Sequence, residues 1–362
     1  MTEESIHDDS IRRRFEADEA YLLAPRACFS SRSRGRTHEE HDCFIRTCFQ
    51  RDTDRIIHSE AFRRLKHKTQ VFLSPSHDHF RTRMTHTLEV AATARCIARS
   101  LRLNEDLTEA ISYGHDLGHT PFGHAGEQVL AEFCIDGFHH AAHSARVVTT
   151  LEKRGVGLNL TAEVIDGILK HSKGRKGPIT VADGADAPLT LEAEIVRVAD
   201  LVAYINHDLD DALRAGLISP EDLPEGPVKL LGERHSKRIH AMVKDIIGAS
   251  WEGDRIGMSP DVWQATEELR AFLYEKVYPR PEIESQVETS RKLLRQMAHW
   301  FMEHPEDLFS RMKHRPPEGQ ALNRTVTDFL AGMTDAYAIT TFKELFVPDT
   351  HLDRRFFSGK GR

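Results

Sequence analysis

The segment YGHDLGHTPFGHAGE, residues 113–127, carries three histidines, an aspartate and a glutamate among fifteen residues. An imidazole beside a carboxylate suits a divalent metal such as Mn, Fe, Co, Ni or Zn, and the same groups can transfer protons. His115 and Asp116 could meet one ion where a helix ends, because Gly114 and Gly118 give the backbone freedom on either side. A His-Asp pair is weak evidence by itself, since the chain repeats it at 41–42, 77–78 and 207–208. The alternative is that these polar residues only cover the surface.

A second set of polar residues follows one face of the apolar segment after Thr190. At helical spacing, one stripe collects Asp200, Tyr204, His207, Asp208 and Asp211. The alternative is a stripe that faces solvent, above all at Asp211. Asp200 differs, because it lies in VRVADLVAY among apolar neighbours, where an unpaired carboxylate would be costly. A bound metal would supply the cation that such a carboxylate needs.

These residues resemble a known pattern. His86 in RTRMTHTLEV, the pair His115–Asp116, and Asp200 in RVADLVAYINHDLDD are similar to the H…HD…D pattern of the HD superfamily of metal-dependent phosphohydrolases. Longer segments resemble the deoxyguanosine triphosphate triphosphohydrolases, specifically their shorter bacterial dGTPase-like branch: SRSRGRTHEE, FQRDTDRIIHSEAFRRLKHKTQVF, HDLGHTPFGH and DFLAGMTDAYA. The resemblance extends from about residue 25 to about residue 347, which is nearly the whole chain.

The resemblance implies one divalent metal ion (Mg, Mn, Co, Fe, Ni or Zn) and assigns its ligands as His86, His115, Asp116 and Asp200. It implies a second set that handles protons and the phosphate chain, namely His119, His124, Glu127 and His140. For substrate binding it implies a phosphate-binding Arg83, a sugar site at Tyr204 and Asp208, and a contact of His67 with the sugar or base. Each of these histidines taken alone could instead be a structural residue.

The activity that the resemblance implies is hydrolysis of deoxynucleoside triphosphates, dGTP or several of them, to the deoxynucleoside and inorganic triphosphate. An activating deoxynucleoside triphosphate and a homo-oligomer are further expectations of the same origin. Two alternatives stay open. One is an HD-type nucleotidase or phosphodiesterase that acts on a monophosphate. The other is a non-catalytic nucleotide sensor or nucleic-acid-binding protein, with single-stranded nucleic acid as its ligand.

The composition limits these alternatives. The chain has 362 residues, 40% of them hydrophobic, and a net charge of −7, which argues against a surface built throughout for nucleic acid. Residues 62–86 are nevertheless basic and could form a small pocket for a compact polyanion, or merely a solvated helix face. No apolar run approaches the roughly 18 residues of a membrane helix. The five cysteines include no C-x-x-C pair, as expected of reduced thiols, so we expect a cytoplasmic protein.

Helical periodicity dominates the chain and predicts an all-α fold, an HD-domain helical core with additional N- and C-terminal helices. Asn104 is a good N-cap for a helix that ends at His115–Asp116. Other helices are expected at about 42–70, at about 85–102, from Thr190 to Gly216, and onward to about 345, with a loop at 172–188. The expected organisation is a loosely ordered segment at 1–40, the HD core at 41–216, a C-terminal helical region packing on it at 217–347, and a tail at 348–362.

Overall fold

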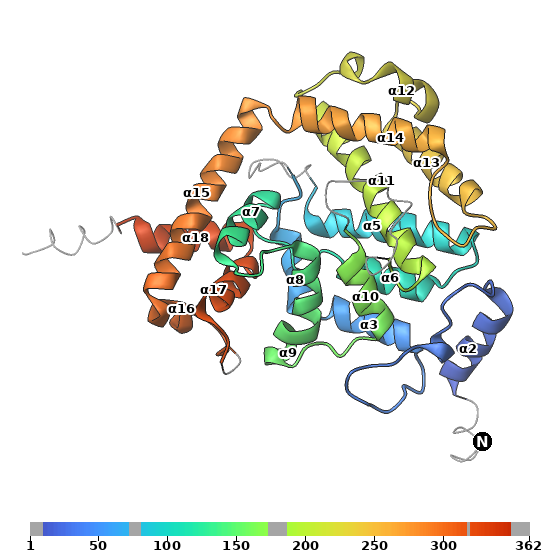
Figure 1. The fold of residues 1–362 in the computed structure, drawn as a ribbon, viewed down its shortest axis with the longest axis horizontal. Coiled ribbons are helices and arrows are strands. Elements are labelled where there is room, and N and C mark those ends of the chain that lie inside the picture. Colours follow the sequence, from blue (N-terminus) through green and yellow to red (C-terminus); the bar gives the residue numbers. More distant parts are fainter. Residues whose placement is uncertain (1–9, 72–80, 173–186, 317–318, 349–362) are drawn as a thin grey trace, which may run out of the picture.

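The computed structural model describes residues 10–71, 81–172, 187–316 and 319–348, and these residues form an all-α fold without a strand (Figure 1). The prediction of fold class is confirmed. The helices are α2 (Ile11–Leu22), α3 (Cys48–Ile57), α4 (Glu60–Arg64), α5 (Arg83–Ser100), α6 (Glu105–Gly114), α7 (His124–Phe133), α8 (His140–Arg146), α9 (Glu152–Gly155), α10 (Ala162–Lys170), α11 (Leu191–Arg214), α12 (Glu225–Leu231), α13 (His235–Ala249), α14 (Pro260–Phe272), α15 (Pro281–Glu303), α16 (Pro305–Arg311), α17 (Leu322–Ala331) and α18 (Asp335–Phe346). Among them, none combines the length and apolar character needed to span a bilayer.

Helix α11 is the centre of the larger hydrophobic core and packs against α5, α6 and α10 (Figure 1). It forms as expected, because Thr190 accepts a hydrogen bond from the backbone N–H of Ala193 and the apolar residues that follow are buried. Two of its neighbours, α6 and α10, pack closely because a glycine lies at their contact. A Cβ atom on Gly114, the last residue of α6, would lie only 2.3 Å from Cδ1 of Ile168 on α10. The end of α6 is therefore held against α10, directly before His115.

Helices α5 and α6 begin at capping residues that the local sequence provides. Thr82 accepts from the N–H of Thr85 and starts α5 one turn before His86. Asn104 accepts from the N–H groups of Asp106 and Leu107, which confirms the predicted N-cap of α6.

The C-terminal helices α15, α17 and α18 form a second hydrophobic cluster together with α7 (Figure 1). Residues 124–133 therefore link the histidine-rich segment to the C-terminal region.

One expectation about the first seventy residues is wrong. The single helix expected at 42–70 is divided into α3, α4 and a short turn at Leu65–His67, because Ser59 caps a new helix by accepting from the N–H of Phe62. In the described part of the N-terminal segment, residues 11–22 form α2, and Glu163 accepts hydrogen bonds from Ser33 Oγ (2.9 Å) and the N–H of Arg34 (2.6 Å). Residues 173–186 of the expected loop and 349–362 of the expected tail lie outside the described residues.

Candidate active site

The structure brings the four predicted metal ligands together from three helices. His86 lies on α5, His115 and Asp116 directly follow α6, and Asp200 lies on α11. His86 Nε2 is 3.1 Å from Asp200 Oδ1 and 3.9 Å from Asp116 Oδ2, and His115 Nε2 is 3.7 Å from Asp116 Oδ1. His115 Nε2 is buried and has no hydrogen-bond partner. A buried, unpartnered nitrogen beside two carboxylates is the donor set that a divalent metal requires.

The two imidazoles among the predicted metal ligands are oriented by the hydrogen bonds of their Nδ1 atoms. His115 Nδ1 donates to the backbone carbonyl of Ser112 at 2.6 Å. His86 Nδ1 lies 2.9 Å from Nε2 of His207, whose own Nδ1 is 2.7 Å from the carboxylate of Asp208. The carboxylate favours a proton on His207 Nδ1, so His207 Nε2 accepts from His86. Both ligand histidines therefore turn an Nε2 lone pair toward the carboxylates.

Arg83 lies against Asp116, with Nη1 donating to Asp116 Oδ2 at 2.7 Å and a side chain that is buried. Burial opposes the charge on Asp116, but His115 and Arg83 outweigh it and hold the pKa of Asp116 well below its usual range. Burial likewise opposes the charge on Asp200, yet the bond with His86 lowers its pKa to about 2. Both carboxylates are thus ionised, as a metal site needs.

The second predicted set also comes together, around the carboxylate of Glu127. Its Oε2 accepts from Nδ1 of His124 at 2.8 Å, while its Oε1 accepts from Nδ1 of His140 at 3.0 Å. His119 stacks on His140 with ring centres 4.7 Å apart. Burial would raise the pKa of Glu127, but the two imidazoles lower it far more. The side chain of His124 is 62% exposed, so its remaining nitrogen is open to a substrate.

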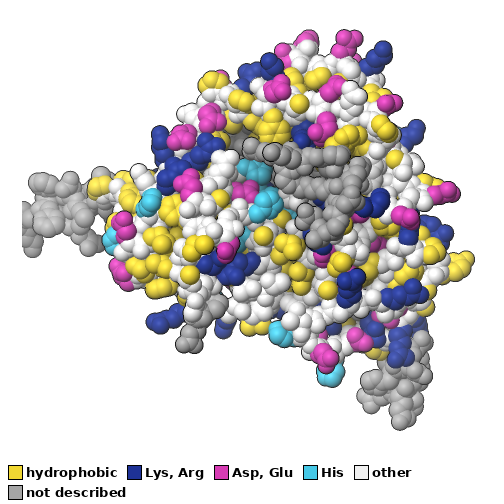
Figure 2. Space-filling model, viewed as in Figure 1, with side chains coloured by type: hydrophobic (Ala, Val, Ile, Leu, Met, Phe, Trp, Pro, Cys, Tyr) yellow, Lys and Arg dark blue, Asp and Glu magenta, His cyan; other side chains and the backbone are white. Residues whose placement is uncertain are grey.

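The turn between the two sets depends on close backbone contacts. A Cβ atom on Gly118 would lie 2.1 Å from the backbone nitrogen of Ser144, so only glycine allows this approach. Gly123 has a φ of +59° directly before His124. The buried Nζ of Lys68 donates to the backbone carbonyl of His119 and, at 2.9 Å, to that of Ala331. Figure 2 shows a group of histidine side chains on the face of the molecule that carries this turn.

The predicted substrate-binding residues differ in how accessible they are. Tyr204 is half-buried one turn after Asp200, but both oxygens of Asp208 face inward, one toward His207 and the other accepting from Tyr278 Oη at 2.5 Å. His67 is exposed in the turn after α4. The solvent-facing alternative for the stripe on α11 is wrong, because Asp211 at its end is also buried.

The basic run at 62–86 does not form one open cationic face in its described part. Lys68 is buried, Arg83 binds Asp116, and Arg81 pairs with three carboxylates, those of Glu89, Asp210 and Asp211.

His171 lies between the predicted metal ligands and the residues around Glu127, but the sequence analysis did not identify it. It follows the last residue of α10, and its ring centre lies 4.9 Å from that of His115. Its Nε2 is 3.3 Å from Nε2 of His140, so it connects the two predicted sets. The only local signal is its place at the end of an amphipathic helix, in GILKH, directly before a glycine-rich loop.

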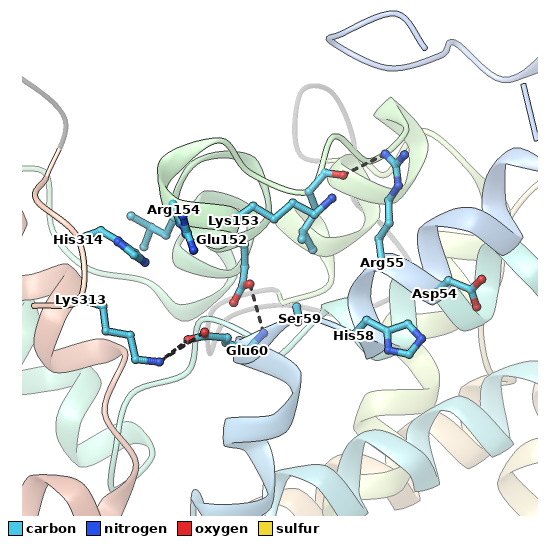
Figure 3. A pocket seen from close by; sticks show the side chains of 12 residues that line it. Asp54, Arg55, His58, Ser59, Glu60, Glu152, Lys153, Arg154, Lys313 and His314 are labelled. Carbon is cyan, nitrogen blue, oxygen red and sulfur yellow. Dashed lines mark hydrogen bonds and ion pairs between the residues drawn. The ribbon is translucent and has the colours of Figure 1, made fainter. Parts of the chain in front are cut away.

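A cavity of about 750 Å³ lies elsewhere, between α3, α4 and the segment 151–158, with Lys313 and His314 on its far side (Figure 3). None of the predicted site residues lines it. Its acidic and basic groups largely pair with one another or with the backbone: Lys313 binds Glu60, Glu152 accepts from the N–H of Glu60, and Arg55 donates to Leu158. The candidate active site is therefore the cluster formed by the predicted metal ligands and the residues around Glu127, and not this cavity.

Comparisons with known proteins find two family matches and several similar proteins. The HD domain family matches residues 83–205, which include all four predicted metal ligands, and a phosphohydrolase-associated domain matches residues 256–344. A protein of Caldanaerobacter subterraneus subsp. tengcongensis, named a deoxyguanosinetriphosphate triphosphohydrolase-like protein, is 50% identical over 96% of this chain and 99% of its own length. Proteins of the same name from Desulfatibacillum aliphaticivorans and Clostridium tetani are 48% and 42% identical, covering 94% and 95% of this chain and 99% and 98% of their own lengths.

Proposed function

Because the chain belongs to the deoxyguanosinetriphosphate triphosphohydrolase-like proteins, which are HD-type phosphohydrolases, we propose that it hydrolyses deoxynucleoside triphosphates to the deoxynucleoside and inorganic triphosphate. The observation that supports this most is the juxtaposition of two sets of residues. One is a metal-ligand set with an unpartnered imidazole, and the other is an imidazole–carboxylate pair, His124 and Glu127, with an open nitrogen.

Each set of residues has its own role in this reaction. Water attacks the α-phosphorus and the bond from phosphorus to the 5′-oxygen breaks. His124 protonates the departing 5′-oxygen, and Glu127 holds the imidazole in place for this transfer. His86, His115, Asp116 and Asp200 would hold the divalent ion, which polarises a phosphate oxygen when bound. His119 and His140 face the phosphate chain.

Arg83 and the sugar residues complete the proposal. Arg83 Nη1 donates to Asp116 and Nη2 donates to the carbonyl of Gln70 at 3.4 Å, while Nε has no partner and can be offered to a phosphate oxygen. Tyr204 packs under the deoxyribose. For Asp208 to reach the 3′-hydroxyl, its hydrogen bond from Tyr278 must be exchanged for one from the sugar. His67 lies at the surface, where it could meet the sugar or the base.

The test is product analysis with the four deoxynucleoside triphosphates, singly and as mixtures, each with Mg²⁺, Mn²⁺ or Co²⁺. Release of inorganic triphosphate and a deoxynucleoside supports the proposal, and a mixture that is cleaved when single nucleotides are not would show activation by a second nucleotide. Release of orthophosphate from a monophosphate alone would favour the nucleotidase. Tight nucleotide binding without turnover under every condition would favour a sensor. His115→Ala serves as the inactive control.

A further inference from the structure

The turn between His119 and His124 contains a strained residue. Phe122 has a φ of +59°, a backbone conformation that bulky side chains rarely adopt, and Gly123 directly after it has the same φ. A residue stays in such a conformation only where its surroundings hold it there, and residues of this kind cluster at active sites. The contacts of Phe122 therefore indicate what fixes the turn.

A carboxylate from the C-terminal region holds the backbone of Phe122. The N–H of Phe122 donates to Oδ1 of Asp335, the first residue of α18, at 2.9 Å. The other oxygen, Oδ2 of Asp335, accepts from the backbone N–H of Thr69 at 2.8 Å and from Thr69 Oγ1 at 2.5 Å. One carboxylate thus joins α18, the turn and the segment that follows α4.

The capping of α18 does not account for these bonds. Thr334 is the N-cap of this helix and accepts from the N–H of Tyr337 at 3.2 Å, so the helix has its own capping residue. A carboxylate in the first turn also interacts favourably with the helix dipole, but this effect needs no partner outside the helix. Asp335 instead accepts from residues that lie 213 and 266 positions away in the chain.

Other contacts fix the same turn to the C-terminal helices. The ring of Phe122 is buried in the hydrophobic cluster that α7 forms with α15, α17 and α18 (Figure 1). Lys68 donates to the carbonyl of His119 and also to that of Ala331, the last residue of α17. His124 follows the turn as the first residue of α7. The backbone on both sides of Phe122 is therefore anchored in this direction.

We propose that Asp335 is a positioning residue of the active site. Its carboxylate fixes the N–H of Phe122 and so holds the turn in its strained conformation, and the turn determines where the imidazoles of His119 and His124 lie. Asp335 acts through the turn and not on the substrate. The C-terminal region, which the phosphohydrolase-associated domain matches, thus takes part in placing these two imidazoles. The catalytic meaning of this inference rests on the proposed function, in which His124 protonates the leaving oxygen.

The first measurement is hydrogen–deuterium exchange of the full-length protein, with mass spectrometry of overlapping peptides that cover residues 119–124. Asp335→Asn keeps the size of the side chain but turns one acceptor oxygen into an NH₂ group, which only donates and cannot serve Phe122 or Thr69. We expect the amides of the turn to exchange about 10-fold faster in Asp335→Asn, because a hydrogen bond to a charged group is lost. Helices α5, α6 and α11 should keep their wild-type rates.

The second measurement is turnover of a mixture of the four deoxynucleoside triphosphates with Mn²⁺. Turnover at saturation should fall about 10- to 100-fold in Asp335→Asn, because a displaced catalytic group loses its alignment with the substrate. Metal content should stay unchanged, since the predicted metal ligands lie outside the turn. Glu344→Gln is the matched control, because it neutralises another carboxylate of α18 that pairs with Arg311 at the surface, and it should change neither exchange nor turnover.

Wild-type exchange of the turn in Asp335→Asn would overturn the inference, and so would normal turnover of a variant whose turn exchanges faster. Faster exchange throughout the chain would also overturn it, because Asp335 would then support the whole fold and not the turn. Should Asp335→Asn fail to fold, the wild type decides, since rapid exchange of the Phe122 amide would mean that no bond holds it. If the wild type cleaves no nucleotide, the proposed function fails, while the exchange data still decide whether Asp335 holds the turn.

Discussion

His86 and His207 form a hydrogen bond between their imidazole rings, with Nδ1 of His86 2.9 Å from Nε2 of His207. One residue is a predicted metal ligand and the other belongs to the same stripe on α11 as Asp200. The stripe thus contributes one predicted ligand, Asp200, and His207, which contacts a second predicted ligand, His86.

The first prediction concerns this support. His207→Gln should lower metal affinity by about 10- to 100-fold, because loss of a partner that orients a ligand histidine typically has an effect of that size. Titration of stripped protein with Co²⁺ measures it. His240→Gln, at an exposed position on α13, should leave the affinity unchanged. Equal affinities for wild type and His207→Gln would show that His86 is oriented without His207.

The second prediction concerns Asp200 as a ligand. Asp200→Ala should remove the metal ion and the activity together, because His86 and His115 would keep only one carboxylate beside them. Asp210→Ala on the same helix is the control, since Asp210 pairs with Arg81 and Arg214 instead. Metal content of the purified proteins is the measurement. Full occupancy in Asp200→Ala would remove Asp200 from the ligand set.

The third prediction separates proton transfer from metal binding. His124→Ala should keep the metal ion and the nucleotide affinity but lose about 10²- to 10⁴-fold in turnover, the usual contribution of general acid–base catalysis. Glu127→Gln should be at least as severe, because the carboxylate holds His140 as well as His124. Turnover, affinity and metal content are measured on the same preparations. Near-normal turnover of His124→Ala would shift the role of acid to His119 or His140.

The fourth prediction concerns Lys68, which is buried and donates to two backbone carbonyls. Lys68→Met should destabilise the fold by about 1–3 kcal/mol, because the carbonyls of His119 and Ala331 lose their donor. Burial, helped by Arg64, holds the pKa of Lys68 well below its usual value. A neutral amine has two N–H groups, which matches the two carbonyls.

The same residue predicts a dependence on pH. Because the pKa of Lys68 is lowered in the folded chain, the stability contributed by Lys68 is complete above the unfolded pKa and falls as the pH drops toward the folded pKa. The difference in unfolding free energy between wild type and Lys68→Met should therefore grow as the pH rises toward the unfolded pKa of about 10.4, by at most about 1.4 kcal/mol per pH unit. Urea denaturation at several pH values measures it, with the exposed Lys66→Met as control. A difference independent of pH would mean that Lys68 is charged in the fold.

The sequence by itself indicated most of the helices and singled out Asp200 as a candidate metal ligand. Apolar residues at helical spacing indicate helices, Asn104 and Thr190 mark where two of them begin, and Asp200 stands out because a carboxylate among apolar residues needs a cation. These are local signals, so they do not depend on how the helices pack. The same logic failed at 42–70, where the cap at Ser59 interrupts a continuous apolar pattern.

The tertiary structure decided which groups face one another. Arg83 lies against Asp116, Glu127 serves two imidazoles at once, and Asp211 is buried against Arg81. His171 enters the centre only because α10 packs beside α6 and α8, which brings together residues 31 positions apart in the chain. Pairing of this kind depends on distances between helices, and no local pattern of residue types encodes those distances.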